Sequence, residues 1–279
     1  MPELPEVETV VVTLRPRVTG QTIHDVVVHR PDIIMPLGLN LRDLLLGQSI
    51  QSVDRRGKRI VFTLGNGQRF YIHLGMTGRL TIDPPHAELL KHTHLIFRLS
   101  SGDVRFRDPR RFGGLWWMEA DIDDATVMGP EPLTLRPAVL ASRLMRTRRA
   151  IKVALLDQQL IAGLGNIYVD EALHAAGIHP LTPADRLSSA QAIALSRAIK
   201  TVLRRAIRSR GSSLRDYVDA EGKQGNFVRY HRVYDRAGKP CVGCRTAIER
   251  IVLGGRSTHF CPQCQGRAKA GNTRMEDGG

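Results

Sequence analysis

The 279-residue sequence has no cysteine in its first 240 positions and no apolar segment long enough to cross a membrane. It also lacks a basic and then apolar N-terminal segment, the pattern of a secretion signal. These absences argue against a disulfide-stabilised secreted protein and against a transmembrane protein. No internal repeat is present, and the length suggests two domains, each large enough for its own core. We therefore expect a soluble intracellular protein.

Acidic side chains are scarce in one half of the sequence. The net charge is +14, but residues 1–142 carry only +1, whereas residues 143–236 carry +9 and residues 237–279 carry +4. A solvated basic surface is one explanation. Because the excess is concentrated in the C-terminal half, the pattern favours a surface that binds nucleic acid.

The four cysteines that are present form two C-x2-C pairs separated by sixteen residues: Cys241, Cys244, Cys261 and Cys264. This spacing is typical of a four-thiolate zinc site. Disulfides are the alternative, but they do not suit a chain without a secretion signal. We therefore predict one zinc ion per chain, with a structural role, because four thiolates leave no open coordination position.

The first residues place a proline directly after the initiator methionine. Removal of Met1 would leave Pro2 as a secondary amine, with a reference pKa of about 7.7–8.0, so some neutral nucleophile would be present near pH 7. Its attack on a sugar C1′ would give an iminium ion, whose fixed positive charge favours elimination. A neighbouring carboxylic acid, Glu3 or Glu6, would protonate the leaving group or the ring oxygen.

The same residues also begin many proteins without such chemistry. Glu6 lies in the first turn of a predicted helix and could simply stabilise its positive end. Glu3 precedes that helix, so we expect it to be the freer of the two carboxylates.

The following segments predict one helix and then many short strands. The helix covers residues 5–15, with apolar residues on one face, and Pro16 is expected to end it. Strands are expected at residues 22–29, 50–56, 59–64, 69–74, 79–82, 94–99, 104–108 and 114–118, separated by turn signals. Short strands at this spacing suggest a β-sandwich.

Three loops of this region carry candidate functional side chains. They are a basic turn with Lys58, a glycine-flanked loop with Met76, and a tight loop with Arg110 and Phe112. Considered singly, each has an ordinary interpretation: Lys58 as a solvated lysine, and Met76 and Phe112 as core residues.

The second half of the sequence predicts helices. Residues 119–145 have the composition of a linker, and helices are expected at residues 147–156, 168–176 and 188–209. The glycine-rich turn at residues 161–168 would expose N–H groups that suit a phosphate, although tight helix packing explains it equally well. Residues 219–226 read as a mobile loop carrying Lys223. Arg256 projects from a predicted hairpin tip between the cysteine pairs.

Together these motifs resemble the bacterial formamidopyrimidine-DNA glycosylases. The resemblance covers nearly the whole chain and is carried, in order, by PELPEVETV, GKR, HLGMTGRL, KHTH, DPRRFG, GLGNIYVDEALHAAGIHP and GGRSTHFC within the zinc finger. The related endonuclease VIII group shares the architecture and acts on oxidised pyrimidines, but it usually begins PEGPE. Leu4 argues against it.

The resemblance implies an α+β multidomain fold. An N-terminal β-sandwich with a leading α-helix would be joined to a C-terminal helix–two-turn–helix domain plus a zinc-finger β-hairpin. We expect a catalytic sandwich at residues 1–130, a linker at 131–146, the helical DNA-binding domain at 147–236, the four-cysteine zinc finger at 237–266 and a disordered tail at 267–279.

The resemblance also implies a bifunctional glycosylase and AP lyase that removes 8-oxoguanine and formamidopyrimidines from damaged double-stranded DNA. Pro2 would be the Schiff-base nucleophile and Glu3 the proton donor, with Glu6 supporting the site. Lys58 would serve β-elimination and Arg256 δ-elimination. Such an enzyme would act as a monomer in the bacterial cytoplasm, associated with the nucleoid.

Further residues match positions that contact DNA in this family. Met76, Arg110 and Phe112 would fill the gap left by the flipped nucleotide, since apolar wedges offset lost stacking. The remaining expected contacts are His92, Arg148, Lys152, Asn166 and, in the loop over the extruded base, Lys223. A zinc-stabilised DNA-binding protein without catalytic activity remains the alternative from a different class.

Overall fold

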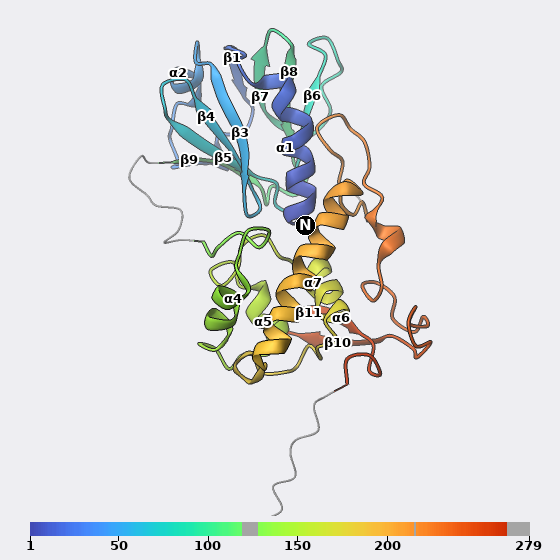
Figure 1. Cartoon of the computed structure of the whole chain (residues 1–279). Coiled ribbons are helices and arrows are strands. Elements are labelled where there is room, and N and C mark those ends of the chain that lie inside the picture. Colours follow the sequence, from blue (N-terminus) through green and yellow to red (C-terminus); the bar gives the residue numbers. More distant parts are fainter. Residues whose placement is uncertain (119–127, 215, 267–279) are drawn as a thin grey trace, which may run out of the picture.

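The computed structural model describes residues 1–118, 128–214 and 216–266. Two hydrophobic cores, one in the strand-rich half and one in the helix-rich half, lie on either side of the N-terminus (Figure 1). A small zinc-finger region completes the chain. This arrangement confirms the predicted α+β multidomain fold, whereas the tail predicted at residues 267–279 lies outside the described residues.

The first helix, α1 (Leu4–Val18), joins the two halves. Its buried apolar residues, Val7, Val10, Val11, Leu14 and Val18, belong to the core of the strand-rich half. Pro16 lies inside the helix, so the prediction that it ends the helix was wrong. The helix continues because Val18 is fully buried, and because the N–H of Thr19 still donates to the carbonyl of Arg15 at 3.0 Å.

The strand-rich half is a sandwich of two sheets. One has the strand order β1 (Ile23–Val28), β7 (Thr93–Leu99), β8 (Gly102–Arg107) and β6 (Arg79–Asp83). The other has the order β2 (Ile34–Met35), β9 (Gly114–Met118), β5 (Arg69–His73), β4 (Arg59–Leu64) and β3 (Ile50–Arg56). Neighbours are antiparallel except β2 and β9. The short helices η1 (Pro31–Ile33) and α2 (Leu41–Leu45) follow β1 and β2.

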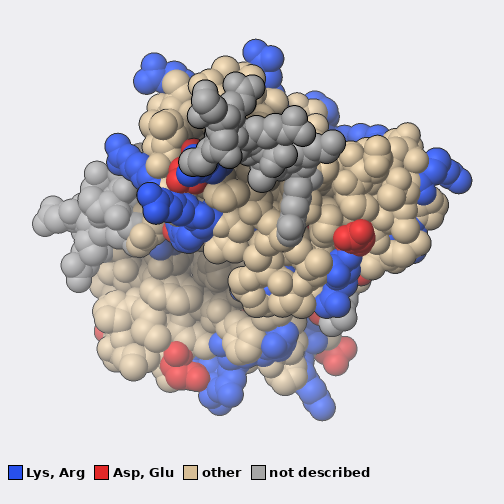
Figure 2. All heavy atoms as spheres, turned by 90° about the horizontal axis from the view of Figure 1, so that it is seen from below, with Lys and Arg blue, Asp and Glu red and all other residues tan. Residues whose placement is uncertain are grey.

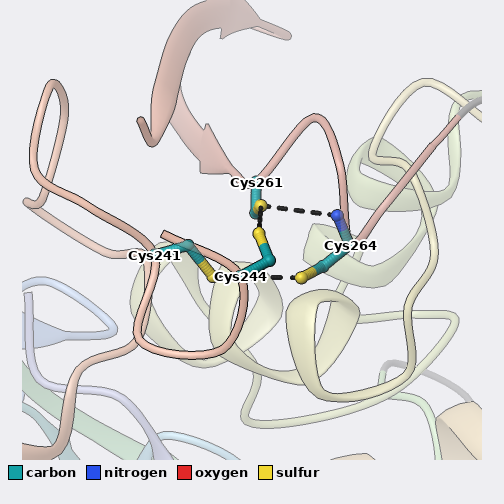
Figure 3. Close-up of side chains that lie close together, drawn as sticks. All are labelled: Cys241, Cys244, Cys261 and Cys264. Carbon is teal, nitrogen blue, oxygen red and sulfur yellow. Dashed lines mark hydrogen bonds between the residues drawn. The ribbon is translucent and has the colours of Figure 1, made fainter. Parts of the chain in front are cut away.

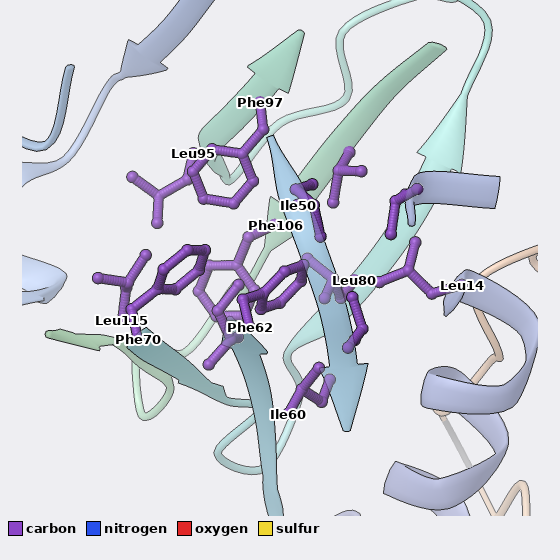
Figure 4. Close-up of a cluster of buried hydrophobic side chains, with 14 of the residues drawn as sticks. Leu14, Ile50, Ile60, Phe62, Phe70, Leu80, Leu95, Phe97, Phe106 and Leu115 are labelled. Carbon is purple, nitrogen blue, oxygen red and sulfur yellow. The ribbon is translucent and has the colours of Figure 1, made fainter. Parts of the chain in front are cut away.

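Aromatic side chains fill the space between the two sheets. Phe62 and Phe70 stack with ring centroids 4.7 Å apart, and Phe97 packs against both. All three are essentially inaccessible to solvent, as is Phe106 (Figure 4). Along β5 the buried Phe70 and Ile72 alternate with partly exposed residues, as expected for a strand with one buried face.

We predict that Phe70→Ala destabilises the protein by about 3–5 kcal/mol, since it leaves a cavity in a close-packed core. The measurement is the free energy of unfolding in denaturant. Phe112→Ala is the matched control: the same atoms are removed from a side chain that is 54% exposed. Equal losses for the two variants would contradict the assignment of Phe112 to the surface.

The helix-rich half contains α4 (Pro137–Leu144), α5 (Ile151–Leu156), α6 (Asn166–Ala175) and α7 (Ser189–Arg208), with the short helices η2 (Ala184–Arg186) and η3 (Phe227–Tyr230). Ser188 is the N-cap of α7, where it forms a capping box with Gln191. Two expectations were wrong. The helix predicted from residue 147 begins at Ile151, and the segment 131–146 is not simply a linker, because α4 buries Leu140 and Leu144 in the second core.

The last region is a hairpin of β10 (Glu249–Leu253) and β11 (Arg256–Phe260). Gly254 and Gly255 both have positive φ at its tip, a conformation that favours glycine. On the face seen from below, lysine and arginine side chains are widely distributed and acidic ones are few (Figure 2). Among the described residues, no helix is both long and apolar enough to span a membrane.

Candidate active site at the domain junction

Glu3 lies where the two halves meet, against the N-terminal end of α6. Its Oε1 accepts a hydrogen bond from the N–H of Ile167 at 2.9 Å, and its Oε2 one from the N–H of Tyr168 at 3.3 Å. Helix N-termini offer unpaired N–H groups and a partial positive charge, which favour a carboxylate. Glu3 is only 3% exposed and Glu6 2% exposed, so exposure does not distinguish the two carboxylates.

The glycine-rich turn before α6 fits closely around this carboxylate. A Cβ on Gly165 would lie 2.3 Å from the Cδ of Glu3, and a Cβ on Gly163 would lie 2.8 Å from the Cδ1 of Leu4. The N–H of Leu4 also donates to the carbonyl of Gly163 at 3.0 Å. Of the two interpretations of this turn, tight packing therefore agrees with the structure, and the Glu3 carboxyl group is the acceptor at the helix end.

Glu6 is a second buried carboxylate, one helical turn further along α1. Its Oε2 accepts the N–H of Glu3 at 2.9 Å, and its Oε1 accepts the hydroxyl of Tyr168 and the N–H of Ser212. Burial raises the pKa of Glu6 to about 7, helped by the charge of Glu3 and opposed by these hydrogen bonds. Burial also raises the pKa of Glu3, against the lowering effects of Lys58 and the α6 amides.

Pro2 opens into a cavity of about 350 Å³ between the two halves, which Glu6, Met76, Arg110 and Ser212 also line. Burial lowers the pKa of the amine at the chain end, carried here by Met1, while Glu3 and Glu6 raise it. A lowered pKa increases the fraction of neutral, nucleophilic amine at pH 7. The chain end, a carboxylate and surface-loop side chains therefore share one enclosed space.

Lys58 approaches the same carboxylates from the turn between β3 and β4. It is 7% exposed, and its ammonium makes no hydrogen bond or ion pair with any residue that the structure describes. Burial lowers its pKa, whereas Glu3 and Glu6 raise it. A buried lysine with a lowered pKa suits proton transfer, because its neutral form is accessible.

The hairpin tip with Arg256 is fastened to the helical half. The ammonium of Lys152 and the side-chain amide of Asn166 each donate to the carbonyl of Ser257 at 2.9 Å. Lys152 also pairs with Asp170 at 2.6 Å. Arg256 itself is exposed and lies close enough to the chain-end amine and Lys58 to lower both pKa values.

Lys152 was predicted to contact DNA, and the structure does not place it where it can. Its side chain is fully buried, and its ammonium is used by Asp170 and Ser257. The isolated burial of a lysine is costly, but the pairing with Asp170 offsets that cost. Lys152 therefore holds the Arg256 hairpin instead of presenting a charge at the surface.

Two loops of the sandwich bring Met76, Arg110 and Phe112 together. Asp108, fully buried, accepts hydrogen bonds from Thr77 and from the N–H groups of Arg110 and Gly113. Met76 is 41% exposed and Phe112 54% exposed, so neither is a core residue. The guanidinium of Arg110 lies 4.6 Å from the centroid of the Phe112 ring.

The remaining predicted DNA contacts lie at the surface, away from the carboxylates. His92 is exposed, with a φ of 69°. Arg148 is 95% exposed, with a long contact of 3.8 Å to Asp185. The Lys223 side chain is 65% exposed, and its ammonium forms a salt bridge with the Glu221 carboxylate. The loop of Lys223 is fixed at its base, because the carbonyl of Ala220 accepts the N–H of Ile82 at 2.9 Å.

The four cysteines converge from two turns of the last region (Figure 3). Their Sγ atoms all lie within 4.8 Å of one another, with 3.4 Å between Cys244 and Cys261 and 3.9 Å between Cys241 and Cys264. All four are free of disulfides. Tetrahedral zinc at about 2.3 Å from each sulfur needs sulfurs roughly 3.8 Å apart, so these thiols fit one structural zinc ion.

We predict that Cys244→Ser removes the metal and abolishes DNA incision while the β-sandwich stays folded, because metal binding and folding are coupled in such modules. Elemental analysis should find one zinc ion in the parent protein and markedly less in the variant. Near-ultraviolet circular dichroism reports on the sandwich aromatics. Full incision by metal-free protein would contradict this assignment.

Comparisons with known proteins agree with this architecture. Residues 1–115 match the formamidopyrimidine-DNA glycosylase N-terminal domain, residues 128–218 its H2TH domain, and residues 238–266 the zinc finger found in FPG and IleRS. The formamidopyrimidine-DNA glycosylases of Chloroflexus aggregans and Rhodospirillum rubrum are each 46% identical to this chain. Both alignments cover 95% of this chain, with 98% and 100% of the respective relatives.

Solved structures agree as well. A complex of Lactococcus lactis Fpg with DNA containing an abasic site has a TM-score of 0.88 and 35% identity, covering 95% of this chain and all of that one. The MutM (FPG) protein from Thermus thermophilus has a TM-score of 0.85 and 41% identity, covering 96% of this chain and all of that one. These matches define a DNA glycosylase of base-excision repair. Within that class, the chain belongs to the formamidopyrimidine-DNA glycosylase family.

The sequence reasoning did not identify several residues that shape this site. Tyr168, Ser212 and Tyr217 surround Glu6, yet they come from α6 and from the segment after α7, more than 160 positions away. His73 is a fourth: its Nδ1 accepts the N–H of Gly75 and so holds the Met76 loop. Tyr168 lies within GLGNIYVDEALHAAGIHP and His73 at the start of HLGMTGRL, so these motifs could have indicated both, whereas no local pattern marks Ser212 and Tyr217.

Proposed function

We propose that the enclosed group of Pro2, Glu3, Glu6 and Lys58 is the catalytic centre for excision of oxidised purines from duplex DNA. The observation that supports this most strongly is the cavity that Pro2 shares with Glu6 beside the buried Glu3. A glycosylase that uses an N-terminal amine needs a neutral nucleophile and a protonated acid at one pH. Burial raises the pKa of Glu3 and lowers the pKa of the amine at this chain end, which Met1 carries here, and both directions are the required ones.

In the proposed reaction, the Pro2 nitrogen attacks C1′ as the bond from C1′ to the oxidised base breaks, and Glu3 donates a proton to the departing base. The resulting iminium acidifies the C2′ proton, and Lys58 assists β-elimination. Arg256, at the hairpin tip, serves the second, δ-elimination. Glu6 supports this group, since its Oε2 accepts a hydrogen bond from the N–H of Glu3.

The exposed side chains fit the recognition of damaged double-stranded DNA. Met76 and Phe112 are apolar, exposed and held on firm loops, as expected for a wedge that fills the gap left by an extruded nucleotide. Arg110 pairs with the orphaned base. His92, Arg148 and Asn166 contact the DNA, as does Lys223 from the loop over the extruded base, and the protein acts as a monomer. Its site of action is the bacterial cytoplasm, at the nucleoid.

Replacing Glu3 should separate the two chemical steps. Glu3→Gln keeps the shape at the end of α6 but removes the acid, so it should lose base excision from an 8-oxoguanine duplex by about 10²-fold or more. It should still cleave a preformed abasic site, where no base has to leave. Gel-based incision assays on the two duplexes measure both steps.

Adding borohydride to the same reactions tests which residue is the nucleophile, because it reduces the iminium intermediate to a stable covalent adduct. The mature protein should become covalently linked to DNA, with the adduct on Pro2 by peptide mass spectrometry. Protein that retains Met1 should bind lesion DNA without trapping, because its Pro2 nitrogen is an amide. An adduct on Lys58 in protein lacking Met1 would mean that the wrong nucleophile has been assigned. A complete absence of trapping would favour the inactive DNA-binding alternative.

The salt dependence of binding distinguishes surface contacts from buried ones. Each neutralised phosphate contributes roughly 0.9 to the slope of log affinity against log salt concentration. Arg148→Ala should therefore reduce that slope by about one contact, and weaken damaged and undamaged duplexes alike. Fluorescence anisotropy at several salt concentrations measures the slope. Arg186→Ala, another substitution of a basic residue in this half, is the control, and an unchanged slope for Arg148→Ala would remove it from the phosphate contacts.

A further inference from the structure

A line of buried polar groups extends from Glu6 through Tyr168 and Ser212 to His231, and none of the roles above uses it. The hydroxyl of Tyr168 donates to the Oε1 of Glu6 at 2.5 Å and lies 3.3 Å from the Oγ of Ser212. That Oγ lies 3.1 Å from the Nε2 of His231. Tyr168, Ser212 and His231 are at most 5% exposed, so solvent does not compete for these contacts.

We propose that Tyr168, Ser212 and His231 form a reversible hydrogen-bond chain that lets Glu6 hold or release a proton without leaving a buried polar group unpaired. The inference rests on the proposed role of Glu6 in the catalytic centre. His231 is a positioning residue in this arrangement, because it acts on Glu6 only through the two hydroxyl groups between them.

The hydrogen-bond chain can point in either of two directions, one for each protonation state of Glu6. When Glu6 is ionised, Tyr168 donates to its Oε1, and the Ser212 hydroxyl donates to Tyr168 or to His231. When Glu6 is protonated, its O–H donates to Tyr168, Tyr168 donates to Ser212, and Ser212 donates to the Nε2 of His231. The second orientation needs an acceptor at the far end, since an unpaired buried polar group would cost about 1–3 kcal/mol.

His231 is suited to be that acceptor. Burial lowers its pKa to about 4, so its ring is neutral at pH 7 and keeps one unprotonated nitrogen. The neighbouring Asp235 and the Tyr234 backbone raise this pKa, and Arg236 lowers it. The rings of Phe227 and Tyr234 pack edge-on against the imidazole, with centroids 5.6 Å away in each case, and so fix its orientation.

The ionisable groups near Glu6 determine how readily its carboxyl group gains or loses a proton. Glu3 disfavours a second negative charge, while Lys58 lies close enough that Glu6 raises its pKa. Tyr168 and Tyr217 keep their protons, since burial raises both pKa values. Glu6, whose pKa is about 7, is therefore a group of this centre with both protonation states populated near neutral pH.

The test is the pH profile of single-turnover excision by wild-type protein and three variants. His231→Phe keeps an aromatic ring but removes the acceptor, and Ser212→Ala breaks the chain while keeping the N–H that binds Glu6. Both changes favour ionised Glu6, so both should shift the apparent pKa near 7 toward lower pH. The loss of one hydrogen bond should shift the apparent pKa by roughly 0.4–1 unit. His231→Gln offers an amide oxygen as acceptor and should restore the wild-type profile.

The melting temperature and zinc content of each variant show whether it is folded. An apparent pKa that is identical in wild type, His231→Phe and Ser212→Ala would overturn the proposal, even if all rates fell uniformly. So would equal shifts for His231→Gln and His231→Phe, because lost packing would then be the cause. If wild-type protein fails to excise the lesion at any pH, the proposed function fails, and that result is distinct from the other two.

Discussion

The contact between the Glu3 carboxylate and the first turn of α6 is the interaction on which the site depends. Through it, Glu3, near the start of the chain, is hydrogen-bonded to a helix in the other half of the molecule. A carboxylate removed from water loses hydration, and the unpaired N–H groups and positive end of a helix offset that loss. The same contact fixes Pro2 at the junction, since only one residue separates Pro2 from α1. Gly165 is required there because any side chain would occupy the position of Glu3.

The parts of the fold that depend on local sequence patterns could be predicted. Strands β3, β4 and β9 have the predicted limits, and the C-x2-C spacing predicted a cluster that the thiols form. The errors occur where distant segments decide the outcome. Pro16 does not end α1, because burial of Val18 favours another turn. Lys152 looks like any lysine of a basic segment, and only its partner Asp170, eighteen positions away, explains its burial.

Exposed apolar residues need a rigid support if they are to act on a ligand instead of collapsing onto the protein. Asp108 provides that support for the loop of Arg110 and Phe112, and through Thr77 it also fastens the loop of Met76. A Cβ on Gly75 would lie 2.4 Å from the Gly113 nitrogen, so the two backbones are in direct contact. The sequence could indicate the wedge residues by resemblance, but the buried carboxylate that couples the two loops follows only from their packing.

The segment after α7 connects the same parts a second time. Ser212 binds Glu6, Ala220 donates to the hydroxyl of Thr13 on α1, and the carbonyl of Ala220 accepts from Ile82 at the end of β6. A loop expected to be mobile is therefore tied to the sandwich at its base, while Lys223 at its outer part is exposed. Movement at Ala220 would break its hydrogen bonds to Thr13 and Ile82. The proposed closure over an extruded base would therefore use the outer part of the loop, where Lys223 is exposed.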